Sequence, residues 1–292
     1  MKRKLLLAAG TLMLLSGAFL YWALGTAPVP GDTPFALDMQ RLRDVALASG
    51  KPLPVAIEQF EVARAEFPKA AVVAGSGLFG RQEMVFRTHI LGYPDGKTVV
   101  IDPVHDAAMH RKYFGAGFNQ ATWDYMERAM ADADLILATH EHLDHVGGIS
   151  AAPDFGRIAA HVELTREQLG SFAIADSGFT PAQLKQLKPL VYDDYYSPAP
   201  GIALKKAPGH SPGSQLIYVQ LASGDEYLFV GDVAWADDNI LKQTGRARLV
   251  SRFMLHENQQ QVAGELAALK QVYERGKVTL VIAHGGDLRK QP

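Results

Sequence analysis

Three histidines and an aspartate cluster directly behind a short apolar run in this chain. The stretch reads Thr139-His140-Glu141-His142-Leu143-Asp144-His145-Val146-Gly147-Gly148. The apolar residues 134–138 before it predict a short buried strand, so the cluster stands on a loop at a strand end. Imidazole nitrogen and carboxylate oxygen are ligands of zinc and similar divalent ions. The spacing is therefore typical of a metal-binding loop, and the two glycines predict a sharp turn after it.

The order of side chains within this cluster predicts how they divide between ions. On an extended loop side chains alternate, so His140 and His142 point to the same side. Asp144 and His145 follow where the chain bends, in a position to face a second ion. A chance gathering of histidines on a polar loop is the alternative, and the ordered spacing argues against it.

Composition limits the classes of protein to consider. The 292 residues are 48% hydrophobic and 21% charged, which is ordinary for a globular chain of one or two domains. The net charge of -2 argues against a nucleic-acid partner, because phosphate binders usually present a basic face. The chain has no cysteine, which excludes disulfides, thiolate metal ligands and a cysteine nucleophile.

The N-terminus has the pattern of an export signal. Lys2-Arg3-Lys4 precedes an apolar run at residues 5–24. This run approaches the ~20 residues that cross a bilayer, which favours an uncleaved anchor, although small residues at 23–25 also allow cleavage. In both cases the basic end stays in the cytoplasm and the remainder is exported. We expect a periplasmic or extracytoplasmic protein, anchored to the inner membrane by residues 5–24 if the signal stays.

Three regions follow from these patterns: residues 1–26 as signal peptide or anchor, 27–69 as linker and N-terminal cap, and 70–292 as the main domain. The linker is expected at residues 26–34, which are rich in proline and glycine. Alternating strand and helix patterns predict an α/β domain with its site at strand ends. Strands are predicted at 54–63, 71–74, 84–93, 97–101, 134–138, 157–162, 190–192, 201–206, 216–221, 227–230 and 278–283, and the longer helices at 37–49, 120–132 and 257–275.

Three later loops each bring one more metal-type side chain to a strand end. His210 lies in Ala207-Pro208-Gly209-His210-Ser211-Pro212-Gly213-Ser214, Asp232 follows Gly231 after a hairpin, and His284 precedes two glycines. Each would be an ordinary loop residue by itself. Their shared placement after apolar strands predicts that they join the first cluster.

The order of these motifs over residues 70–292 resembles that of the metallo-β-lactamase superfamily. The resemblance implies an αββα sandwich, in which two mixed sheets pack together between helices and the site lies at one edge. It implies His140, His142 and His210 as ligands of a first metal ion, and Asp144, His145 and His284 as ligands of a second, with Asp232 bridging both. A shared carboxylate offsets the repulsion of two ions ~3.5–4 Å apart. Seven ligands divided between two ions also leave open positions for catalysis.

This site implies hydrolysis by a metal-bridging hydroxide, because water between two divalent ions loses a proton near neutral pH. The hydroxide would attack an ester, lactone, amide or phosphoryl centre of a small-molecule substrate while the ions stabilise the developing charge. Asp144 is expected to pass a proton to the leaving group, so Asp144 and Asp232 are the predicted catalytic residues. Zinc is the default metal, and Fe²⁺, Mn²⁺ and Co²⁺ suit the same ligands.

The branches of the superfamily differ at positions that this chain also has. True β-lactamases generally lack the bridging aspartate, which disfavours that activity. Lactonases usually carry a tyrosine three residues after it, where this chain has Trp235, whose indole donates one hydrogen bond but is no acid. Tyr192, Tyr195 and Tyr196 are alternative phenols. A small ester or lactone is the favoured substrate. The alternative substrates are a thioester and a phosphodiester or nucleic acid, and the alternative function is non-catalytic ligand binding.

Several further residues have expected roles outside the ligand set. Asp102 resembles a strand-end aspartate that supports a ligand. Trp235, Phe253 and Met254 are expected to line an apolar pocket. The five remaining histidines are interpreted as structural or surface residues, with His105 and His256 nearest to predicted site loops: His89, His105, His110, His161 and His256. The oligomeric state is not set by any pattern.

Overall fold

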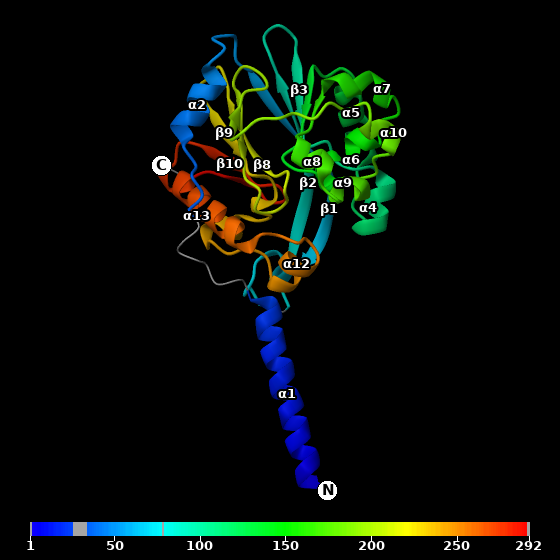
Figure 1. The fold of residues 1–292 in the computed structure, drawn as a ribbon, viewed down its shortest axis with the longest axis vertical. Coiled ribbons are helices and arrows are strands. Elements are labelled where there is room, and N and C mark those ends of the chain that lie inside the picture. The colour runs from blue at the N-terminus through cyan, green and yellow to red at the C-terminus, as the bar shows by residue number, and fades with distance from the viewer. Residues whose placement is uncertain (1, 26–33, 78, 291–292) are drawn as a thin grey trace.

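Two β-sheets pack face to face, and helices cover both outer faces (Figure 1). The structure is a computed structural model that describes residues 2–25, 34–77 and 79–290. Residues 26–33 of the predicted linker lie outside the described residues.

The first sheet has the strand order β1-β2-β3-β4-β5. β1, β2 and β3 pair antiparallel, whereas β3, β4 and β5 run parallel. Because β3 and β4 are parallel, the residues that follow them, Asp102 and Thr139, come out at the same edge. The bounds are Ala56–Pro68 for β1, Arg81–Gly92 for β2, Thr98–Ile101 for β3, Leu135–Leu137 for β4 and Val162–Glu163 for β5.

The second sheet has the order β11-β10-β9-β8-β7-β6, antiparallel except between β9 and β10. That one parallel pair places Asp232, which follows β9, beside His284, which follows β10. The bounds are Tyr195–Tyr196 for β6, Ile202–Lys206 for β7, Gln215–Gln220 for β8, Glu226–Phe229 for β9, Thr279–Val281 for β10 and Asp287–Leu288 for β11.

Three apolar layers hold the sandwich together. Between the sheets, Ile101 and Leu137 pack with Ile217 and Phe229 in one buried cluster. Outside the first sheet, Met126 and Met130 of α5 (Gln120–Ala131) are buried, and outside the second, α2 (Met39–Leu47) and α13 (Gln259–Arg275) bury their apolar faces. The predicted four-layer αββα sandwich is therefore confirmed. The shorter helices are α3 Lys69–Val72, α4 Ala107–Tyr113, α6 Leu143–Ser150, α7 Phe155–Ile158, α8 Arg166–Gly170, α9 Ala173–Asp176, α10 Pro181–Leu184, α11 Asp237–Leu241 and α12 Arg248–Phe253.

The strand predicted at 190–192 is reduced to a single bridge between Leu190 and Thr165. Two further predicted strands are partly helical instead. Of residues 71–74, the first two end α3 and the others lie in a turn, and residues 157–162 contain the end of α7 and a 3-10 turn before β5 begins. Short apolar runs fit a buried helix as well as a strand, so periodicity alone misassigned both. At α7 the helix start is set by Asp154, whose side chain accepts from the Arg157 backbone N–H.

The range 27–69, predicted as linker and cap, also contributes to the first sheet. β1 lies within it and pairs with β2 along almost its whole length. The predicted boundary at residue 70 thus falls between two neighbouring strands.

An N-terminal helix, α1 (Lys2–Leu24), extends away from the sandwich and meets it near α12 (Figure 1). At that junction the Arg248 side chain donates to the Trp22 carbonyl oxygen at 2.7 Å. The side chains of residues 1–3 and 5–8 are not described. Among the stretches of helix whose side chains are described, none is both long and apolar enough to cross a membrane. Export and anchoring stay predictions.

Candidate metal centre

The histidine cluster lies on the loop from β4 into α6. His142 is the N-cap of α6, and Asp144 and His145 stand in its first turn. The expected bend is thus a helix start. Gly147 and Gly148 are inside α6 rather than in a sharp turn, so that prediction was wrong. Both serve close packing, since a Cβ would lie 2.8 Å from His105 Cβ at the first and 2.8 Å from the Val104 carbonyl oxygen at the second.

A first group of four side chains gathers at the edge of the sandwich: His140, His142, His210 and Asp232. His142 Nδ1 lies 3.0 Å from His140 Nε2 and 2.9 Å from His210 Nε2. Asp232 Oδ2 is 3.6 Å from His140 Nε2 and 3.3 Å from His210 Nε2. Ligand atoms around one tetrahedral zinc ion are about 3.3 Å apart, given bonds near 2.0–2.1 Å. The spacing therefore suits one divalent ion.

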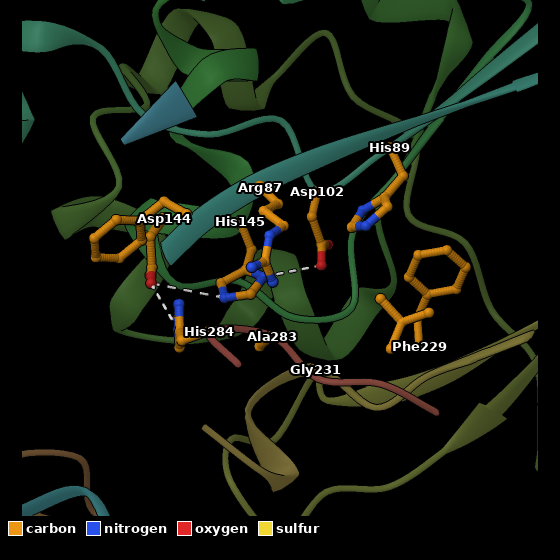
Figure 2. A pocket seen from close by; sticks show the side chains of 11 residues that line it. Arg87, His89, Asp102, Asp144, His145, Phe229, Gly231, Ala283 and His284 are labelled. Carbon is orange, nitrogen blue, oxygen red and sulfur yellow. Dashed lines mark hydrogen bonds and ion pairs between the residues drawn. The ribbon is translucent and has the colours of Figure 1, made fainter. Parts of the chain in front are cut away.

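A second group lies next to it and consists of Asp144, His145, Asp232 and His284. Asp232 Oδ1 is 3.3 Å from His145 Nε2 and 3.1 Å from His284 Nε2. Asp144 Oδ2 is 3.7 Å and 3.4 Å from the same two nitrogens. Figure 2 shows Asp144, His145 and His284 converging on one another. All seven predicted ligands are thus brought together in the predicted division, with one oxygen of Asp232 toward each group.

The position of Asp232 depends on the glycine that precedes it. Gly231 has φ 51°, and a Cβ on it would lie 2.9 Å from Thr139 Cβ. Only glycine fits this left-handed, crowded position, which presses the loop after β9 against the loop after β4. Burial by itself raises the pKa of Asp232, but the surrounding imidazoles outweigh it and hold the pKa well below its ordinary value.

Asp102 supports the second group from behind, as the sequence led us to expect. Its Oδ2 accepts from His145 Nδ1 at 2.9 Å (Figure 2). The same oxygen accepts from the Thr139 hydroxyl at 2.9 Å. Its Oδ1 accepts from the Thr139 backbone N–H at 2.6 Å. Its φ is 54°, a strained value for a residue other than glycine. On His284, Nδ1 donates to the Val85 carbonyl oxygen at 3.1 Å.

Buried atoms without partners indicate what the centre would hold. Among the described residues, His145 Nε2, His284 Nε2 and Asp232 Oδ1 are buried with no hydrogen-bond partner, and they face one another. Leaving such atoms unpaired is costly, and a divalent ion would satisfy all three at once. The donor set of imidazole and carboxylate therefore fits the metal ions that the sequence predicts.

Burial keeps part of the first group in the form that binds metal. It lowers the pKa of His142 to about 4 and that of His140 well below its ordinary value. These imidazoles are neutral at pH 7, as metal ligands must be. For His145 burial also acts to lower the pKa, but Asp102 and the other carboxylates raise it well above the usual range.

Three buried glutamates near the centre were not singled out from the sequence. Glu141 points away from its neighbouring histidines and accepts from the Ser211 hydroxyl at 2.9 Å. Glu257 accepts from His210 Nδ1 at 2.6 Å, and Glu265 accepts from the Gly209 backbone N–H at 2.9 Å. Period-two alternation indicates the direction of Glu141. No local pattern indicates the other two, which lie 47 and 56 residues from their partners.

The three residues that were expected to line an apolar pocket lie in different surroundings. Trp235 is buried, its ring centroid 6.0 Å from that of His284, and its indole nitrogen has no partner among the described residues. Phe253 and Met254 are instead 54% and 70% exposed, and the Phe253 ring packs against Trp22 of α1. Only Trp235 is therefore placed to act at the centre.

The alternative phenols and the remaining histidines have other surroundings. Tyr192 donates to Gln215 Oε1 at 2.6 Å, Tyr195 accepts from the Asp38 backbone N–H at 3.4 Å, and Tyr196 stacks on Tyr192. None of the five other histidines belongs to either group in the described structure. Their contacts are His89 with Gln59, His105 with His110, His161 with the Asp134 carbonyl oxygen, and His256 with the ring of Phe172.

Comparison with known proteins places the chain in a family. The model of the metallo-beta-lactamase superfamily matches residues 88–273, so the chain belongs to that superfamily. It is 28% identical over 112 residues to an N-acyl homoserine lactonase of Bacillus thuringiensis, and 22% identical over 153 residues to one of a Bacillus species. These matches cover 37% and 52% of this chain, and only 41% and 56% of the two relatives.

Solved structures show the same fold at low identity. A quorum-quenching N-acyl homoserine lactone lactonase is 15% identical with a TM-score of 0.63, over 80% of this chain and 93% of that one. A dizinc quorum-quenching lactonase in complex with a product is 14% identical with a TM-score of 0.59, over 80% and 88%. A metal-dependent hydrolase from Staphylococcus aureus, described as probable, is 14% identical with a TM-score of 0.61, over 80% and 91%.

Proposed function

We propose that this protein is a dinuclear metal-dependent hydrolase of small carboxylic esters, with lactones favoured. The observation that carries the proposal is the position of Asp232, which directs one oxygen to each of two adjacent groups of ligands. The resemblance of the chain to N-acyl homoserine lactonases supports a lactone over other esters. We propose zinc as the metal, because a relative in fold is a dizinc enzyme.

Two bound ions would supply Lewis acidity and a water of lowered pKa. The residues of the chain have separate tasks around them. Asp232 holds the two groups at a fixed spacing, and Asp102 orients His145. Asp144, which is less buried than the histidines of its group, is placed to hold a proton for the leaving group. The unpartnered indole N–H of Trp235 is available to donate to a substrate oxygen.

The proposal is tested by metal analysis together with a panel of substrates. The purified full chain is loaded with zinc and assayed on N-acyl homoserine lactones, simple lactones, aryl esters, thioesters, phosphodiesters and a β-lactam. We expect two ions per chain and the highest kcat/KM on a lactone or ester. One ion or none would contradict the dinuclear site, and preference for a phosphodiester would assign the same site to another substrate class.

We also propose that the chain is exported and held at the inner membrane by its N-terminus. Support comes from Lys2-Arg3-Lys4 before the apolar residues 5–24, and from exposed apolar side chains on α1 such as Leu14 and Phe19. Fractionation of cells expressing the full chain tests this. Recovery in the cytoplasmic fraction would contradict it.

A further inference from the structure

A buried ion pair stands directly behind His210, on the side away from Asp232. His210 Nε2 faces the first group, 3.3 Å from Asp232 Oδ2. Its other ring nitrogen, Nδ1, lies 2.6 Å from Glu257 Oε1. The same carboxylate oxygen pairs with the guanidinium of Arg246. The side chains of all three residues are at most 1% exposed.

This arrangement determines which nitrogen of His210 carries a proton. A carboxylate only accepts hydrogen bonds, so the imidazole donates from Nδ1 and leaves the Nε2 lone pair directed at the first group. A buried carboxylate is costly unless it is paired, and Arg246 provides the pairing charge. Partners of this kind orient a ligand and raise its basicity.

Arg246 also contacts Trp235, which belongs to neither ligand group. Its guanidinium carbon lies 4.9 Å from the centroid of the Trp235 ring, and that ring packs against His284. A planar guanidinium can stack on an indole and pair with a carboxylate at once, whereas a lysine ammonium lacks that shape. The requirement at position 246 is therefore for arginine rather than for any positive charge.

We propose that Glu257 and Arg246 are positioning residues that fix His210 as an Nε2 ligand and so set the affinity of the ion at the first group. The inference rests on the proposed dinuclear site. The ion at the second group depends on Asp102 and the Val85 carbonyl instead, and is insensitive to this pair.

The chain offers a matched control in Glu265. The side chain of this glutamate is buried like that of Glu257 and supports the same loop, but it accepts from the Gly209 backbone N–H and does not touch the imidazole. Glu265→Gln thus replaces a buried carboxyl group near His210 by an amide without altering the ligand.

The experiment measures zinc affinity of the full chain by competition with a chromophoric chelator. We expect E257Q to weaken one of the two ions about 10- to 100-fold, R246K to weaken the same ion less, and E265Q to leave both unchanged. To assign the ion, E257Q is combined with H284A, which keeps the first group, and with H142A, which keeps the second. The affinity of the remaining ion should fall in the first combination only.

A spectroscopic readout separates positioning from general loosening of the fold. Long-range ¹H–¹⁵N spectra of the zinc-loaded protein should show His210 protonated at Nδ1 in the wild type and in E265Q, with altered Nδ1 and Nε2 shifts in E257Q. If E257Q does not fold, R246K carries the same test. Equal affinities in wild type, E257Q and R246K would overturn the inference while the wild type still binds two ions. A wild type that binds fewer than two would overturn the proposed function instead.

Discussion

The two ligand groups share Asp232 but are supported by different parts of the molecule. The second group is held by the first sheet, through Asp102 at the end of β3 and the Val85 carbonyl in β2. The first group is held at His210 by Glu257, which lies between α12 and α13 and is paired with Arg246. One group therefore depends on backbone already fixed by strand pairing, and the other on a buried charge pair in a helical connection. Mutations in one support should therefore affect one ion more than the other.

The largest effect is expected at Asp232, because both ligand groups include this residue. Asp232→Asn removes charge from both groups at once, so both ions should bind more weakly. We expect kcat/KM to fall by more than ~10²-fold, because loss of an outer partner alone costs up to that much. Metal content and kcat/KM are the measurements. The control is Asp238→Asn, a carboxylate that is paired with Lys69 and Lys242 and belongs to neither ligand group. A fully active D232N would contradict the shared role.

The next largest effect concerns the pH dependence of the free energy of unfolding. It arises at Glu265, which supports the loop of His210. Burial raises the pKa of Glu265 to about 7, above the ordinary value of 4.5. Glu265 binds its proton more tightly in the folded chain than in the unfolded chain. Its contribution to the free energy of unfolding is therefore complete below about pH 4.5 and is lost as pH rises through about 7. The loss should amount to about 3 kcal/mol, because each tenfold difference in proton affinity between the folded and unfolded chain is worth about 1.4 kcal/mol.

Glu265→Gln isolates this contribution, since the amide resembles the protonated acid. Urea unfolding of wild type and E265Q with chelator present, from pH 4.5 to 8, should show E265Q gaining stability relative to wild type as pH rises. A difference that does not change with pH would contradict the raised pKa.

Asp102 tests the support of the second group, because His145 is the only ligand among the described residues that it contacts directly. Asp102→Asn should lower the affinity of the second ion about 10- to 100-fold and leave the first unchanged. Asparagine tolerates the positive φ at this position, so the backbone is retained, whereas alanine would add strain. Zinc titration of D102N beside E257Q compares the two supports directly. Loss of both ions in D102N would show that the groups are not independent.

The smallest effect is expected at Trp235, which touches the centre without supporting either group. Trp235→Phe removes only the indole N–H, and should raise KM for a lactone about 3- to 10-fold, the value of one hydrogen bond. Trp235→Ala should raise it further with metal content unchanged. Steady-state kinetics and metal analysis are the measurements. Unchanged KM in both variants would remove Trp235 from the substrate site.

Much of the fold could be predicted because its signals are local. The hairpin at Tyr93–Gly96 and the helix at 120–131 follow from turn residues and from periodicity within a few residues. The failures at α3 and α7 concern apolar runs of four to six residues, which are too short for the two periods to differ. A turn was predicted at Gly147 and Gly148, whereas both glycines lie in a helix and allow close packing against His105 and Val104. Those two residues belong to a loop distant in sequence, so no local pattern indicated this role.

The seven side chains of the candidate centre could be selected from the sequence, because each follows an apolar strand and parallel strands end at a common edge. Their division between two ions was implied by the resemblance to the metallo-β-lactamase superfamily. Of the groups that orient these ligands, Asp102 was expected from the resemblance, and it reaches His145 across 43 residues. Glu257 was found only in the tertiary structure, where it reaches His210 across 47 residues. Periodicity describes a few turns of chain and says nothing about contacts at that separation. The order of the motifs therefore indicates the ligands, whereas the groups that orient them depend on strand pairing within the first sheet and on the connection between α12 and α13.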